Sequence, residues 1–264
     1  MVTTATLVWL AIGAVFAFAL PIGLLVWWRK TRKARLLPFF VGAAVFVVFA
    51  LVLETMLHQV CVFGDNAVSR AINANPYLYM LYGGLAAGVF EETGRYVAFC
   101  WLIGKRRYPE RDTAVTYGIG HGGIEAMLIL GATYATYLVL ALCWNRGNEP
   151  AALALAGGSA EALALLRGAL GQITPGMCAV AMLERAGTLL FHIALSVFVF
   201  LAARDRRQWT WFPFAVALHA IADMPAALYQ RGILPLAATE IWVWVVALYA
   251  LRSARKQYLE AMDP

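Results

Sequence analysis

The chain has 264 residues, of which 62% are hydrophobic and only 14% are charged, and its mean hydropathy is +0.70. A soluble domain is about 45–50% apolar and about 25% charged. The composition therefore excludes a soluble globular protein, and the high apolar content excludes a disordered one. A formal net charge of +6 would suggest nucleic acid in a soluble protein, but in a membrane protein it reflects basic loops. We expect the lipid bilayer as a partner and no nucleic acid.

Seven stretches are long and apolar enough to cross a bilayer, since a spanning helix needs about 20 residues. The alternation typical of barrel strands is absent, which leaves helices. The expected fold is all-α: a polytopic membrane helical bundle of about seven transmembrane helices, in one integral membrane domain over residues 1–264. The first stretch lacks a cleavage site, so we interpret it as a retained helix. The stretches are Ala5–Trp28, Leu37–Val62, Leu78–Ile103, Val115–Leu142, Ala179–Ala202, Trp211–Tyr229 and Ile233–Leu251.

One long connection, Asn145–Met177, is too interrupted by glycine and proline for a simple span. Its segment Ala160–Leu170 has a helix-forming composition, so we expect a short external helix or a re-entrant piece. Cys143 and Cys178 flank the connection, and an oxidising exterior would permit a disulfide between them. The alternative is that all four cysteines are inert apolar residues.

The basic residues predict the orientation of the chain. Most Lys and Arg side chains follow the first, third, fifth and seventh stretches, as in Arg29–Arg35 and Lys105–Arg111. Cytoplasmic loops carry the excess of Lys and Arg in membrane proteins. The pattern therefore places the N-terminus outside and the C-terminus in the cytoplasm, with multiple passes through the membrane.

Ionisable residues inside a bilayer cost at least about 2.5–3.5 kcal/mol each on insertion scales, so each is a functional hypothesis. Counted from the cytoplasmic ends, polar residues of four spans share a layer roughly 12–18 Å deep, at 1.5 Å per residue. Glu54 and His58 lie outside this layer and are interpreted as local, while Glu240 lies at its depth but alone. The layer contains Glu91, Glu92, Arg95, Glu125, His192, His219 and Asp223.

Spacing within each helix supports the same grouping. Residues three or four apart share a helix face, and nearby glycines let helices approach closely. Carboxylates and imidazoles in a wet intramembrane cavity suit general acid–base hydrolysis. The pairs on shared faces are Glu91 and Glu92 with Arg95, His121 with Glu125, and His219 with Asp223.

Several segments resemble motifs of the CAAX-protease and bacteriocin-processing superfamily, which includes the prenyl-protein endopeptidase and the PrsW proteases. Glu91–Arg95 resembles its EExxR motif, and His219–Asp223 resembles its HxxxN/D motif. Tyr117–His121 is similar to its FxxxH motif, with Tyr in place of Phe. With Gly118–Glu125 and Glu184–His192 added, the pattern resembles most closely the YhfC group of membrane peptidases. The resemblance covers the core helices 78–229.

This resemblance implies an intramembrane protease with a CAAX-protease/PrsW-like core in a bacterial plasma (inner) membrane. Its substrate would be a membrane-associated protein or peptide. Glu91 would activate water, and Glu92 would pair with Arg95. His219 and Asp223 would bind the oxyanion or complete the site.

The second motif leaves two assignments open. His121 matches the second-motif histidine of the superfamily. Alternatively, Glu125 matches the second-motif glutamate of PrsW-like members, in which a histidine on the next helix corresponds to His192. The chain keeps all three side chains, so all three are candidates for the catalytic site.

The polar layer also allows a catalytic zinc, which takes three protein ligands from His and Asp or Glu and leaves a position for water. No HExxH pair is present, and the resemblance to the prenyl-protein endopeptidase implies water activated by glutamate and histidine without a metal. We place Zn²⁺ ahead of this glutamic mechanism, because the chain offers more ligands than the latter requires. The candidate ligands are Glu91, Glu125, His192, His219 and Asp223.

Two other functions compete with proteolysis. A proton-coupled transporter also lines its path with histidines and carboxylates, although repeated halves and broken helices, which are usual in transporters, are not evident. A non-catalytic membrane scaffold would keep buried charges only as structural ion pairs, since buried charges must pair whatever their purpose.

Overall fold

The computed structural model describes residues 1–260, in which helices are joined by short turns and no strand occurs. This confirms the all-α fold class. The helices are α1 (Thr4–Arg32), α2 (Leu37–Phe46), η1 (Val47–Glu54), α3 (Thr55–Cys61), α4 (Ala67–Ala74), α5 (Pro76–Gly104), α6 (Asp112–Ala126), η2 (Met127–Ala132), α7 (Thr133–Asn145), α8 (Glu149–Leu155), α9 (Ala160–Gln172), α10 (Pro175–Arg204), η3 (Arg206–Gln208), α11 (Trp211–Gln230) and α12 (Leu236–Glu260).

Six helices of the described chain are long and apolar enough to cross a membrane, and a bent pair raises the number to seven. The polytopic helical bundle is thereby confirmed, and the protein is a multi-pass membrane protein in contact with lipid. The bent pair consists of α8 and α9, which meet at 95° as a broken span or a re-entrant loop. It occupies the connection for which we expected a short external or re-entrant helix. The six are Thr4–Arg32, Leu37–Cys61, Asp112–Asn145, Pro175–Arg204, Arg206–Gln230 and Leu236–Glu260.

Helix α5 is not among these six, although the sequence predicts a span there. It is continuous over 29 residues, or roughly 43 Å at 1.5 Å per residue, which is enough for a bilayer. Its composition is less apolar because it carries Glu91, Glu92 and Arg95, all of which are buried. Burial inside protein is where charged residues of a spanning helix are tolerated, so its assignment as a span stays a prediction.

Two features of the helices were not predicted. The segments η1 and η2 are π-helical, and π-turns often occur at functional sites. The short helix α4 precedes α5, and its N-cap Asn66 accepts a hydrogen bond of 2.9 Å from the Ser69 backbone N–H. Asn75 caps α5 in the same way, with Pro76 at the first helical position, as is typical of helix starts.

The chain divides into two compact units, which are described separately below. Unit 1 contains Met1–Gly23 and Glu125–Ala186, and unit 2 contains Leu24–Ile124 and Gly187–Pro264. A compact unit need not fold alone, so the single membrane domain over residues 1–264 stays a prediction. All four cysteines are free thiols, Cys143 and Cys178 of unit 1 included.

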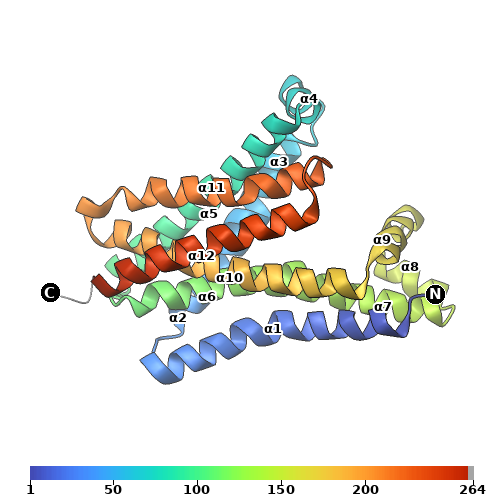
Figure 1. The fold of residues 1–264 in the computed structure, drawn as a ribbon, viewed down its shortest axis with the longest axis horizontal. Helices are drawn as coiled ribbons and strands as arrows, with labels where there is room; N and C mark the ends of the chain where they lie inside the picture. The colour runs from blue at the N-terminus through green and yellow to red at the C-terminus, as the bar shows by residue number, and fades with distance from the viewer. Residues whose placement is uncertain (261–264) are drawn as a thin grey trace. The chain divides into compact units, whose positions relative to one another are not determined.

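Unit 2 owes its tight packing to glycines at helix contacts. Helices α5 and α11 run side by side (Figure 1). A Cβ at Gly88 would lie 2.6 Å from the Val216 carbonyl oxygen of α11, so only glycine permits this approach. On α6, a Cβ at Gly120 would collide with the Phe39 carbonyl of α2. These contacts support the expectation that glycines beside the polar residues bring helices close together.

Candidate functional site

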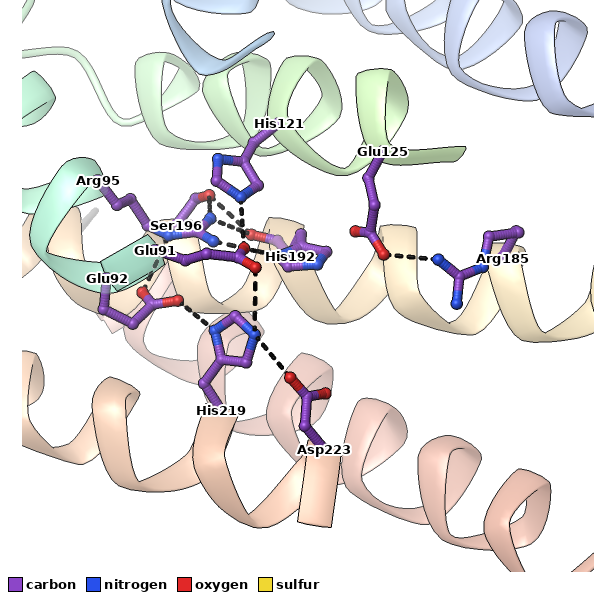
Figure 2. Close-up of polar contacts among 10 residues, drawn as sticks. All are labelled: Glu91, Glu92, Arg95, His121, Glu125, Arg185, His192, Ser196, His219 and Asp223. Carbon is purple, nitrogen blue, oxygen red and sulfur yellow. Dashed lines mark hydrogen bonds and ion pairs between the residues drawn. The ribbon is translucent and has the colours of Figure 1, made fainter. Parts of the chain in front are cut away.

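Four helices of unit 2 bring polar side chains together in its interior (Figure 2). Residues 191–202 of α10 are all buried, so this helix forms the centre of the unit. All the site side chains except Asp223 are buried. The set consists of Glu91, Glu92 and Arg95 from α5, His121 from α6, His192 and Ser196 from α10, and His219 and Asp223 from α11.

Glu91 lies among three imidazoles. Its Oε2 is 2.8 Å from Nε2 of His121 and 4.0 Å from Nδ1 of His192. Its Oε1 is 4.0 Å from Nε2 of His219. The His121 and His192 ring centroids are 5.0 Å apart. A buried carboxylate in contact with several imidazoles is suited to proton transfer or to metal binding.

Glu92, the neighbouring carboxylate, forms a fully buried ion pair with Arg95. The Arg95 Nε lies 2.9 Å from Glu92 Oε2, and both side chains have no exposed surface. His219 Nδ1 lies 2.7 Å from the other oxygen of Glu92. Since a carboxylate only accepts hydrogen bonds, Nδ1 of His219 is the donor. Glu92 thus fixes the orientation of the His219 ring, with Nε2 facing Glu91.

Arg95 also holds helix α10 in place. Its Nη1 donates to the His192 carbonyl oxygen at 3.0 Å and to Ser196 Oγ at 2.5 Å. Its Nη2 lies 3.1 Å from His192 Nδ1, and because a guanidinium only donates, the imidazole nitrogen accepts. Ser196 in turn donates to the His192 carbonyl oxygen at 2.7 Å. The guanidinium therefore positions His192 and, through Glu92, His219.

Asp223 is the exposed member of the set. Its Oδ2 lies 3.4 Å from His219 Nε2, and 45% of its side chain is exposed, against 3% for His219. The two residues are four apart on one face of α11, as the spacing predicts. Asp223 therefore lies where the buried cluster reaches accessible space.

Glu125 and Arg185 belong to unit 1 and form an ion pair there. Arg185 Nη1 donates to Glu125 Oε1 at 2.6 Å, and the same guanidinium pairs with Glu184. Depth, the four-residue spacing from His121 and the motif resemblance made Glu125 a candidate site residue. Its ion pair with Arg185 was not predicted, and its place in the catalytic site stays a prediction.

Ser196 is a site residue that the sequence analysis missed. A serine adds little to the free energy of inserting an apolar helix into a membrane. Unlike a charged residue, it is therefore not marked as a candidate by hydropathy. A signal was nevertheless present: Ser196 follows His192 by four residues, which puts both on one face of α10. On this face of α10, Ser196 accepts a hydrogen bond from Arg95.

The residues present fit a metal ion. Glu91, His121 and His192 each offer one ligand atom, these atoms all lie within 4.8 Å of one another, and all three residues are buried. One carboxylate and two imidazoles are a ligand set of catalytic zinc. The His121 nitrogen that faces Glu91 is Nε2, so this nitrogen is the one that would bind a metal shared with Glu91. The trio shares Glu91 and His192 with the predicted ligands and adds His121.

Comparisons with known proteins agree with this chemistry. A family model described as YhfC intramembrane metalloprotease matches residues 16–250. The chain is also 37% identical over 248 residues to the membrane protein YhfC of Bacillus subtilis (strain 168), with 94% of each chain covered. No solved structure matches the chain.

Proposed function

Because this chain belongs to the YhfC intramembrane metalloprotease family, we propose that it hydrolyses a peptide bond of a membrane-associated protein or peptide at the Glu91 cluster. The observation that carries this proposal is the buried Glu91 carboxylate, which faces His121, His192 and His219 within 2.8–4.0 Å. The reaction class is acid–base-assisted hydrolysis of an amide.

Glu91 and His219 would activate the attacking water together. The 4.0 Å between Glu91 Oε1 and His219 Nε2 is too long for a direct hydrogen bond, and a single water can bridge two atoms at this separation. Glu91 accepts a hydrogen bond from this water, and His219 takes its proton and later gives it to the leaving amine. The His219–Glu92 hydrogen bond keeps the ring oriented and stabilises its protonated form, as a carboxylate does for the histidine of a hydrolytic triad.

Glu91, His121 and His192 are the residues that would hold a divalent metal, and zinc is the metal that their chemistry favours. When bound, such a metal lowers the pKa of water to about 7 and polarises a carbonyl oxygen. Arg95 would hold His192 through its backbone carbonyl oxygen, whereas its contact with His192 Nδ1 would have to give way to the metal, because a neutral imidazole has only one nitrogen lone pair to offer. In the glutamic alternative, Glu91 and the histidines activate water without the metal.

The orientation is part of the same proposal. The basic connections after the first, third, fifth and seventh predicted spans put the N-terminus outside and the C-terminus in the cytoplasm of the plasma membrane. Orientation decides which side of the membrane the substrate comes from, so it bears directly on the biology of the enzyme.

The experiment compares cleavage in bacterial membranes that contain wild-type protein or Glu91→Gln, by mass spectrometry of newly formed peptide N-termini. Glutamine keeps the shape but removes the charge that polarises the water for His219, and the loss of acid–base assistance costs about 10²–10⁴-fold in rate. New N-termini should disappear in Glu91→Gln while its thermal unfolding in detergent stays close to wild type.

The matched control is Glu110→Gln, which alters a half-exposed carboxylate on a surface loop of the same unit and should leave cleavage unchanged. A scaffold or a transporter would give the same N-termini in all three membranes. Near-normal cleavage by Glu91→Gln would refute the proposed site.

A further inference from the structure

A cavity of about 260 Å³ lies in unit 2, next to the candidate site. Its walls come from η1, α3, α5 and α11 and from the turn after α3, and its polar lining consists of Glu54, His58, Tyr79, Tyr82, Asp223 and Gln230. Asp223 lines this cavity and is also part of the candidate site, because its Oδ2 is 3.4 Å from His219 Nε2. A ligand in this cavity, which we name the acidic cavity, would therefore reach the edge of the Glu91 cluster.

The acidic cavity is lined by two carboxyl groups and by no basic Lys or Arg side chain. Glu54 is 8% exposed, and Asp223 is half-exposed. A cation in such a partly enclosed space favours the ionised form of the carboxyl groups that line it. The lining favours a positively charged occupant over a neutral or negative one.

Glu54 is held in a fixed position. His58 Nε2 lies 3.3 Å from Glu54 Oε1, and His58 Nδ1 lies 2.7 Å from the Tyr82 hydroxyl oxygen. These two contacts join η1, α3 and α5. A carboxylate whose orientation is set by a second partner is a pre-organised acceptor for a charged group.

The remaining lining suits the stem of a long side chain. Gly83, Ala87, Ala226 and Ala227 line the cavity, and their small side chains leave room along α5 and α11. Lys and Arg bury an apolar stem while their charged heads find polar partners. The combination of small residues and two carboxylates matches this shape.

One nearby arginine is kept out of the cavity. Arg231 follows α11, and its guanidinium lies 3.9 Å from the centroid of the Tyr79 ring. It donates to Asn73 Oδ1 at 2.6 Å and does not line the cavity. The Arg231 guanidinium is therefore bound to Asn73 and Tyr79 at the end of α11, and no ion pair joins it to Glu54 among the described residues.

We propose that the acidic cavity is a substrate subsite that binds a lysine or arginine side chain of the peptide next to the bond that is cut. The side chain would enter past Phe63, Tyr79 and Gln230, at the end of unit 2 that is opposite the basic connections. As a subsite it rests on the proposed proteolytic function, but its preference for cations is independent of cleavage and is tested separately.

The test measures the charge preference of the cavity with single reporter cysteines. Ala226→Cys and Val62→Cys place a thiol on the lining in a background with Cys61, Cys100, Cys143 and Cys178 replaced by serine. Each variant, in the full chain in proteoliposomes, reacts with 2-(trimethylammonium)ethyl or 2-sulfonatoethyl methanethiosulfonate. Ala74→Cys, exposed at the end of α4, gives the intrinsic ratio of the two rates.

We expect the cationic reagent to react at least about tenfold faster than the anionic one, relative to Ala74→Cys, because two nearby carboxylates attract one and repel the other. Adding Glu54→Gln should remove most of this preference, and Glu110→Gln should not change it. n-Butylammonium, a lysine side-chain mimic, should slow labelling, whereas n-butanol should not.

Equal relative rates for both reagents at both reporter positions would overturn the proposal, and so would a preference that survives Glu54→Gln. Two reporters keep the test decisive if one substitution prevents folding. If the charge preference holds while Glu91→Gln still cleaves, the proteolytic assignment fails and the cation-binding cavity stands.

Discussion

Two groups of ionisable residues, one in each unit, both contain glutamates and an arginine but differ in what surrounds their carboxylates. In unit 1, Arg185 pairs with Glu125 and Glu184. In unit 2, Arg95 pairs with Glu92 and contacts His192 and Ser196. The neighbouring Glu91 is left to face three imidazoles. An arginine that neutralises a carboxylate makes a structural pair, whereas imidazoles around a carboxylate provide groups that can exchange protons or bind a metal.

The largest effect in this comparison is expected for Arg95→Lys. Lysine keeps the charge but cannot reproduce the fork that contacts Glu92, His192 and Ser196 at once. Loss of such outer-shell contacts typically costs about 10–100-fold in activity. The rate of substrate cleavage should fall by this amount, while Arg185→Lys in unit 1 should cleave at nearly the wild-type rate. Equal rates for both variants would show that the Arg95 contacts do not position the site.

For the pair in unit 1 the expected effect is on stability, and the effect on cleavage is smaller. Arg185→Gln leaves Glu125 buried without its arginine, and breaking a buried ion pair costs about 3–5 kcal/mol. Adding Glu125→Gln should recover much of this loss, because the uncompensated charge is gone. Thermal unfolding in detergent measures both variants. The double variant should still cleave substrate. Loss of cleavage in a folded Glu125→Gln protein would show that Glu125 takes part in catalysis.

The smallest effect is expected for the topology variants, which report on orientation without changing the site. Cysteines placed in turn at Thr31 and Asn148, in the cysteine-free background, should react with an impermeant thiol reagent from opposite sides of the membrane. Thr31 lies among the basic residues at the end of α1, and Asn148 caps α8. Labelling of both from the same side would contradict the predicted orientation.

The sequence predicted the helices better than their contacts. Hydropathy placed the spans, and the spacing of Glu92 and Arg95 and of His219 and Asp223 predicted pairs that the structure contains. These are relations within one helix, which local geometry determines. Helix ends were less accurate: α12 continues to Glu260, well past the predicted Leu251, because its last turns are polar.

Contacts between helices were not predictable in the same way. Depth along a span gives the height of a residue but not the direction in which its side chain points. Depth made Glu125 a site candidate, but it could not predict the ion pair with Arg185. Ser196 was missed because its partner, Arg95, is on another helix. The rotation of each helix follows from packing, for example at Gly88 and Gly120, which single-helix spacing does not encode.

The metal content of the purified protein tests the central claim most directly. Protein prepared without chelator is analysed for zinc and other divalent metals, in wild type and in three variants. The account predicts stoichiometric zinc in wild type and in Glu125→Gln, and its loss in His121→Ala and His192→Ala, since these two histidines join Glu91 within 4.8 Å. Metal-free wild-type protein that still cleaves its substrate in excess chelator would contradict the metal site and leave Glu91 and its histidines to activate water alone.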